Sequence, residues 1–128
     1  MTRILVIDDQ PAVRESIEIT LHSKNFEVVS VEGGRAGLRA FEESSFDLVI
    51  VDIFMPDMDG VTLIKALRKS NPNLPIVAIS GILVSASGQT TLDLLPTVPN
   101  LSNVICLKKP FRPDELIQAI QSAIDAAA

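Results

Sequence analysis

Five short, continuous runs of branched apolar residues divide the sequence at intervals of about 20 to 30 residues. They are RILVI at 3–7, VVSV at 28–31, LVIV at 48–51, IVAI at 76–79 and VICL at 104–107. Runs of this kind are typical of strands in a parallel sheet, because such strands are covered on both faces and both must be apolar. The sequence therefore predicts five buried strands, and what separates them decides the fold.

Four stretches with apolar residues at helical spacing lie between or after these runs, at 11–24, 34–44, 60–69 and 113–126. The first opens with Pro11, a residue that suits the first turn of a helix. Its apolar stripe comprises Val13, Ile17 and Leu21. Strands that alternate with helices in this way predict an α/β fold, a doubly wound parallel sheet with helices on both faces.

Composition narrows the class of protein. The 128 residues, 47% of them hydrophobic, fit one domain over residues 1–128 with a core of its own. A net charge of -5 argues against direct nucleic acid binding through a basic face. One cysteine permits no internal disulfide, and no stretch resembles a signal peptide or a membrane span. We therefore expect a cytoplasmic protein that binds neither nucleic acid nor membrane directly.

Polar side chains follow four of the predicted strands, where each strand ends. Asp8 and Asp9 follow the first strand, Asp52 the third, Ser80 the fourth and Lys109 the fifth. In doubly wound sheets the carboxyl ends of the strands meet at one edge, where ligands bind. Three carboxylates, one hydroxyl and one ammonium are therefore expected to converge there.

The charges of this cluster do not balance. Two carboxylates about 4 Å apart repel each other by roughly 4 kcal/mol at an effective dielectric constant near 20. Lys109 compensates for one negative charge only. A hard divalent cation offsets the rest, and Mg²⁺ suits a site of one or two carboxylates, waters and a phosphate group. The cluster is therefore expected to bind Mg²⁺ and to accept a phosphoryl group.

Four motifs, in the order VIDDQ, VIVDIFMPDMDG, VAISG and KKPF, resemble those of the receiver domain of two-component response regulators. The resemblance covers nearly the whole chain and implies the flavodoxin-like strand order 2-1-3-4-5. It also implies a phosphorylation-dependent signalling switch rather than an enzyme in its own right. The donor would be a histidine kinase or a phosphotransfer protein, and phosphorylation would change a partner-binding surface.

The resemblance assigns the metal ligands. Asp9 and Asp52 would ligate Mg²⁺ directly, the backbone carbonyl of Phe54 would be a third ligand, and Asp8 would contribute through water. Each residue also has a simpler interpretation, because an acid pair ahead of a helix is favoured by the helix dipole without any metal. Asp57 and Asp59, in the same motif as Asp52, are interpreted as turn and cap residues.

The resemblance also assigns the groups around the phosphoryl. Asp52 would be the phosphoacceptor, Ser80 would donate its hydroxyl to a phosphoryl oxygen, and Lys109 would pair with the phosphoryl group. Lys108 alternates to the opposite side of its strand and is expected to be solvated. The bond before Pro110 is expected to be cis.

Three other classes of function were weighed. A flavodoxin-like electron carrier needs a phosphate-binding loop after the first strand, where this chain has the acidic segment DDQPAV. An aspartyl-nucleophile phosphatase would carry a second acid two residues after Asp52, where this chain has Phe54. A degenerate receiver, acting as a phosphorylation-independent interaction module, is the remaining alternative, and the intact set of acids, hydroxyl and lysine argues against it.

The chain departs from the family pattern near its output face. Twenty-nine positions separate Ser80 from Lys109, more than is usual, and Pro96 and Pro99 lie between them. The fourth helix is therefore expected to be short or displaced. Cys106 occupies a position that is usually aromatic.

Three expectations follow for signalling. The change on activation should be carried by residues 81–103, and the output should be a downstream protein or an output domain that this sequence does not include. The resemblance also implies that Phe54 and Ile82 flank the approach of the hydrolytic water, and neither side chain can orient it, so the phosphorylated state should be long-lived.

Overall fold

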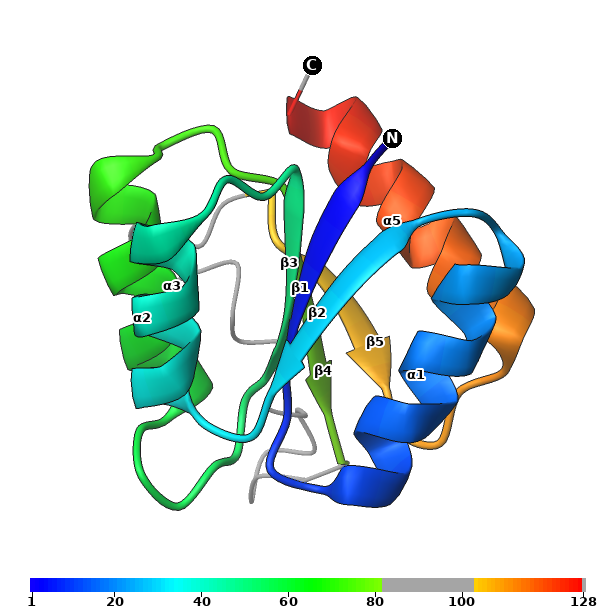
Figure 1. The fold of residues 1–128 in the computed structure, drawn as a ribbon, viewed down its shortest axis with the longest axis horizontal. Helices are drawn as coiled ribbons and strands as arrows, with labels where there is room; N and C mark the ends of the chain where they lie inside the picture. Colours follow the sequence, from blue (N-terminus) through cyan, green and yellow to red (C-terminus); the bar gives the residue numbers. More distant parts are fainter. Residues whose placement is uncertain (82–102, 128) are drawn as a thin grey trace, which may run out of the picture.

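The computed structural model describes residues 1–81 and 103–127, which form a five-stranded parallel sheet flanked by helices (Figure 1). The strand order is β2-β1-β3-β4-β5, as the resemblance implied. The strands are β1 (Arg3–Ile7), β2 (Glu27–Val31), β3 (Leu48–Asp52), β4 (Ile76–Ser80) and β5 (Ile105–Lys108). The five apolar runs therefore located every strand to within one residue at each end.

Within the described residues, two helices cover each face of the sheet, as the reader can follow in Figure 1. They are α1 (Pro11–Ser23), α2 (Gly34–Glu43), α3 (Gly60–Ser70) and α5 (Pro113–Ala127), and α2 and α3 lie on one face while α1 and α5 lie on the other. The fourth helix that the sequence predicts as short or displaced falls outside the described residues. None of the helices described is long and apolar enough to cross a membrane.

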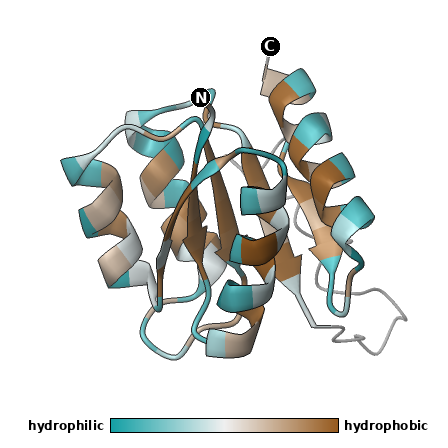
Figure 2. Cartoon of the chain, turned by 45° about the vertical axis from the view of Figure 1, so that its right-hand side comes forward, coloured by the Kyte–Doolittle hydropathy of each residue, from teal (hydrophilic) through white to brown (hydrophobic). Residues whose placement is uncertain are grey.

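The core has two halves, one on each face of the sheet. Neighbouring residues of β1 point to opposite sides, so that Ile7 packs with Leu63 of α3 while Val6 packs with Ile17 of α1. Every residue of β3 and β4 is buried, and the strands form an apolar centre between helices with polar outer faces (Figure 2). Full burial of one such side chain stabilises the fold by about 1.5–3 kcal/mol. The buried strands therefore hold the residues at their ends in place.

The loop between β3 and α3 caps two helices. Asp59 caps α3, because its carboxylate accepts hydrogen bonds from the Thr62 N–H at 2.8 Å and from the Thr62 hydroxyl at 2.9 Å. Asp57, which the sequence also predicts to be a turn or cap residue, caps the start of α2 rather than that of α3. Its carboxylate accepts the N–H groups of Gly34 and Arg35, both at 3.2 Å. The N–H groups of Arg35 and then of Gly34 lower the pKa of Asp57.

The close approach of this loop to α2 requires glycine. A Cβ atom on Gly33 would lie 2.9 Å from both carboxylate oxygens of Asp57, and one on Gly34 would lie 2.8 Å from the Met58 Cβ. The Gly33-Gly34 pair is therefore a loop-to-helix junction that fits the Asp57 cap of α2.

We predict that Gly33→Ala and Asp57→Ala disturb the same contact. Each should lower the free energy of unfolding by about 0.5–1 kcal/mol, because each removes the cap of α2, by displacing the carboxylate or by deleting it. The double variant should lose no more than Asp57→Ala alone. Urea unfolding of the three variants measures this. Asp59→Ala, which removes the α3 cap, is the matched control. Its loss in free energy of unfolding should add to that of Gly33→Ala in the double variant. Additive losses for Gly33→Ala and Asp57→Ala would contradict the prediction.

Candidate functional site

The carboxyl ends of the strands lie at the edge of the sheet opposite the chain termini (Figure 1). Asp8 and Asp9 directly follow β1, and Asp52 is the last residue of the adjacent strand β3. One carboxylate oxygen from each of the three residues lies within 4.8 Å of the other two. The order of the sheet reverses between β1 and β3, so this cluster occupies the topological switch point, where ligands bind in folds of this type.

Lys109, directly after β5, reaches across the sheet to this acidic cluster. Its Nζ atom lies 3.1 Å from Asp8 Oδ2 and 3.3 Å from Asp52 Oδ2. Asp8 is fully buried and Asp52 is 3% exposed, while the Lys109 side chain is 19% exposed. One ammonium thus serves two buried carboxylates, and Asp9, which is half-buried, adds a third acid beside them.

Asp8 is a residue of the cluster rather than of the helix that follows it. Helix α1 begins at Pro11, and its first turn contains no acid. Asp8 Oδ1 accepts the backbone N–H of Gln10 at 2.8 Å. Asp8 Oδ2 is buried and accepts no hydrogen bond, because its 3.1 Å contact with Lys109 is an ion pair without hydrogen-bond geometry. A buried carboxylate oxygen without a hydrogen bond is costly, and a cation would satisfy it.

The pKa of Asp52 is raised to about 6 by burial, and then by the negative charge of Asp8. The Lys109 ammonium opposes this shift, as does the Phe54 N–H, which donates to Asp52 Oδ1 at 3.2 Å. Burial and repulsion outweigh these two stabilising contacts. The set of donors, three carboxylates that share one ammonium and include a buried oxygen without a hydrogen bond, therefore fits a divalent cation with oxygen ligands.

Ser80 ends β4 and is fully buried. Its hydroxyl donates to the Gly81 carbonyl at 2.7 Å, and its own carbonyl accepts the Lys109 N–H at 2.7 Å. A hydroxyl has one hydrogen to donate, so Ser80 must leave the Gly81 carbonyl before it can donate to anything bound at Asp52.

Comparison with known proteins decides the family. Residues 4–121 match the family model described as the response regulator receiver domain. The chain belongs to this family. It is 33% identical to the chemotaxis protein CheY of Bacillus subtilis over 124 residues, covering 96% of this chain and 98% of that protein. It is 32% identical to the transcriptional regulatory protein GlrR of Escherichia coli K12 over 125 residues, which are 98% of this chain but only 27% of GlrR.

Solved receiver domains have the same fold. A response regulator receiver domain protein from Clostridium thermocellum superposes with a TM-score of 0.82 at 28% identity, covering 98% of this chain and 95% of that one. The receiver domain here thus spans nearly all of its shorter relatives and about a quarter of GlrR.

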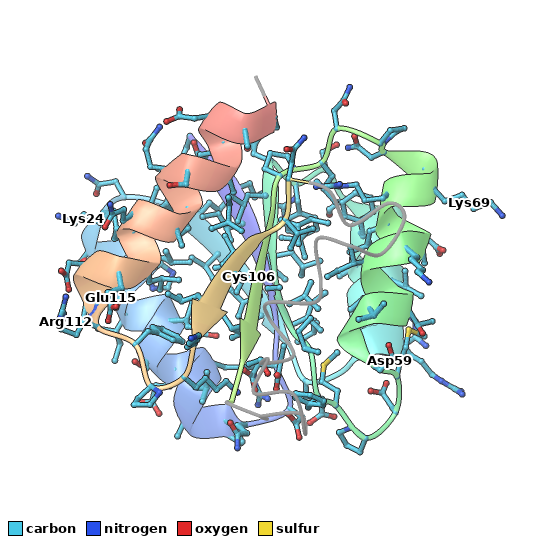
Figure 3. The ribbon with its side chains drawn as sticks, turned by 180° about the vertical axis from the view of Figure 1, so that it is seen from behind. Lys24, Asp59, Lys69, Cys106, Arg112 and Glu115 are labelled. Carbon is cyan, nitrogen blue, oxygen red and sulfur yellow. The ribbon has the colours of Figure 1, made fainter. Side chains whose placement is uncertain are left out.

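Beside the site, β5 of this receiver domain and the bond that follows Lys109 include the other positions singled out in the sequence. Lys108 is exposed, as strand alternation indicated, and the bond between Lys109 and Pro110 is cis. Cys106 lies on β5, the edge strand of the sheet, and packs partly buried against the α2–α3 half of the core (Figure 3). Ile82, and the segment expected to carry the change on activation, lie outside the described residues apart from the ends of that segment.

Sequence reasoning missed two residues that contact the site. Gln10 accepts a hydrogen bond from Lys109 Nζ through its side-chain oxygen at 2.9 Å. Arg14 donates from Nη1 to the backbone carbonyl of Asp8 at 2.8 Å. Both are near the start of α1, and the only signal in the sequence was that Gln10 is a poor N-cap residue at an N-cap position.

We predict that Asp52→Asn stabilises the receiver domain at pH 7 when divalent cations are chelated. The folded-state pKa of Asp52, about 6, lies above its ordinary value of 3.8. Its contribution to stability is therefore full below pH 4 and is lost as the pH rises through 6. Removing the charge should raise the free energy of unfolding by up to about 3 kcal/mol at pH 7.

Urea unfolding in EDTA at pH 7 and pH 4 measures the difference between wild type and Asp52→Asn. The two proteins should converge at pH 4, where Asp52 is protonated in the folded state. Asp59→Asn, at an exposed cap, is the control for amide substitution as such. An Asp52→Asn variant no more stable than wild type at pH 7 would show that Lys109 fully compensates the buried charge.

Proposed function

We propose that this receiver domain is a phosphorylation-dependent signalling switch, with Asp52 as the phosphoacceptor and a histidine kinase or a phosphotransfer protein as the donor. The observation that carries the proposal is the position of Asp52. It is a buried carboxylate at the switch point of the sheet, 3.3 Å from an ammonium and within an acidic cluster, in a member of the receiver family.

The reaction is a transfer between two nucleophiles. An Asp52 carboxylate oxygen forms a bond to phosphorus while the bond from phosphorus to the donor imidazole nitrogen breaks, and the electron pair leaves with that nitrogen. The transferring group spreads negative charge over three oxygens, so catalysis depends on positioning and on charge compensation. Lys109 already contacts Asp52 Oδ2 and needs only a small movement to reach a phosphoryl oxygen.

Asp9, Asp52 and the Phe54 carbonyl would hold Mg²⁺, with Asp8 contributing through water. The bound ion would offset the negative charge of the carboxylates and of the phosphoryl group. This assignment is supported by the unsatisfied Asp8 Oδ2 and by the three carboxylate oxygens that lie within 4.8 Å of one another.

Phosphorylation would exchange the partners of two groups. Lys109 would turn from Asp52 Oδ2 to a phosphoryl oxygen, and the Ser80 hydroxyl would leave the Gly81 carbonyl for another phosphoryl oxygen. Because Gly81 begins the chain segment that leads toward β5, this release connects the site to the surface that a downstream protein, or an output domain, would contact. The domain assists its own phosphorylation and dephosphorylation without being a turnover enzyme.

We predict that acetyl phosphate and Mg²⁺ add one phosphoryl group to the wild type and none to Asp52→Asn. Asp9→Asn should weaken Mg²⁺ binding and slow the reaction. Asp57→Asn is the matched control, because Asp57 lies in the same motif but caps α2, and it should react like wild type. Intact-protein mass spectrometry with and without EDTA measures this. A wild type that stays unmodified, yet binds its partner equally well, would instead support the phosphorylation-independent module.

We also predict a long-lived phosphorylated state. The Phe54 side chain follows Asp52 by two residues and is 44% exposed at the edge of the site, where it can shield the phosphorus but cannot orient water. Phe54→Asn should speed dephosphorylation by roughly 3–10-fold, because a polar side chain can align the attacking water. Ile19→Asn, an exposed apolar residue on α1, is the control. Decay measured by mass spectrometry that is fast in wild type and unchanged in Phe54→Asn would sink this idea.

A further inference from the structure

Gln10 makes two contacts with the acidic cluster, and its position in the fold does not otherwise explain them. It is the N-cap residue of α1, between Asp9 and Pro11. Its backbone N–H donates to Asp8 Oδ1 at 2.8 Å, and its side-chain Oε1 accepts from Lys109 Nζ at 2.9 Å, across 99 positions of sequence. Gln10 therefore joins the end of β1 to the lysine that follows β5.

The side chain of Gln10 does not cap its helix. Residues with short polar side chains are favoured at an N-cap, where they accept a hydrogen bond from the first turn, and replacing such a cap typically costs about 1 kcal/mol. Gln10 makes no side-chain cap hydrogen bond. The longer side chain instead extends to Lys109, so this position favours the lysine contact over helix capping.

The Lys109 ammonium has three hydrogens, and among the residues that the structure describes it has three oxygen neighbours. Two neighbours are carboxylates, at 3.1 Å in Asp8 and 3.3 Å in Asp52, and the third is the amide of Gln10, which is the nearest at 2.9 Å. A bound cation or a phosphoryl group changes the charge and the occupancy of both carboxylates. The amide of Gln10 is neutral, so its charge and its position as an acceptor do not depend on such a change.

We propose that Gln10 is a positioning residue that holds the Lys109 ammonium at the site while its carboxylate partners change. The inference rests on the proposed function, in which Lys109 turns from Asp52 to a phosphoryl oxygen. A lysine side chain is long and flexible, and the contact with Gln10, an exposed residue whose backbone N–H is held by Asp8, limits the positions that the ammonium can take. Since orientation supplies a large part of the rate in phosphoryl transfer, loss of the amide acceptor should slow the reaction.

Gln10→Met tests this, because methionine has a similar length and no amide oxygen. We expect the rate constant for phosphorylation by acetyl phosphate, at saturating Mg²⁺, to fall by roughly 3–10-fold. Gln10→Glu keeps an acceptor for the ammonium, but it adds a negative charge beside the cluster, so it is compared by the ammonium signal alone. The second readout is the NMR signal of the Lys109 ammonium, which exchanges slowly with water while it is hydrogen-bonded. This signal should broaden in Gln10→Met and persist in Gln10→Glu, with thermal unfolding unchanged in Gln10→Met.

A Lys109→Met background separates positioning from a general effect on the site. In that background Gln10→Met should leave the residual rate unchanged, since the group on which Gln10 acts is gone. An equal slowing in both backgrounds, or a wild-type rate and ammonium signal in Gln10→Met, would overturn the proposal. If the wild type accepts no phosphoryl group, the proposed function fails, and the ammonium signal still decides whether Gln10 holds Lys109.

Discussion

One ammonium between two buried carboxylates is the interaction on which the functional edge of this protein depends. Lys109 follows β5, and of its partners Asp8 follows β1 and Asp52 ends β3, so the ion pair ties together the ends of three strands. It compensates less charge than the cluster carries, because Asp9 adds a third acid. The raised pKa of Asp52 and the orphaned oxygen of Asp8 are two consequences of the same deficit. A site of this kind is poor in positive charge, and it gains by binding a cation.

The acidic cluster can lack full charge compensation because the rest of the fold is stable enough to hold the acids in place. The strands that deliver the acids are buried on both faces, and the side chains of the two core halves fix their positions. Each buried branched side chain contributes about 1.5–3 kcal/mol, so a few of them offset the cost of one uncompensated charge. Strand order places β1 beside β3, so that Asp8 and Asp52 meet at the switch point. The centre of the sheet therefore stabilises the fold, and the candidate site lies at its edge.

Sequence reasoning was accurate where a local pattern carries the information. Apolar runs and helical stripes located the elements to within one residue, because burial on two faces or on one stripe leaves a periodic record. The positions of the three acids, Ser80 and Lys109 at strand ends followed from the same record. No sequence pattern marks the hydrogen bond of Gln10 with Lys109 or that of Asp57 with the start of α2, because each joins segments that are far apart in the sequence. Nor could a sequence show that the Ser80 hydroxyl donates to Gly81, because this depends on one rotamer.

These missed contacts share a property that bears on switching. In the proposed function a new dianion on Asp52 competes for two donors, Lys109 and Ser80, and each of them already has another hydrogen-bond acceptor. The Lys109 ammonium is held by Gln10, and the Ser80 hydroxyl by Gly81. The backbones of Ser80 and Lys109 are also joined, through a carbonyl and an N–H 2.7 Å apart. If both donors turned toward the phosphoryl group, the two ends of β4 and β5 that this hydrogen bond joins would both be affected. The structural change would then be concentrated on that side of the sheet rather than spread over the domain.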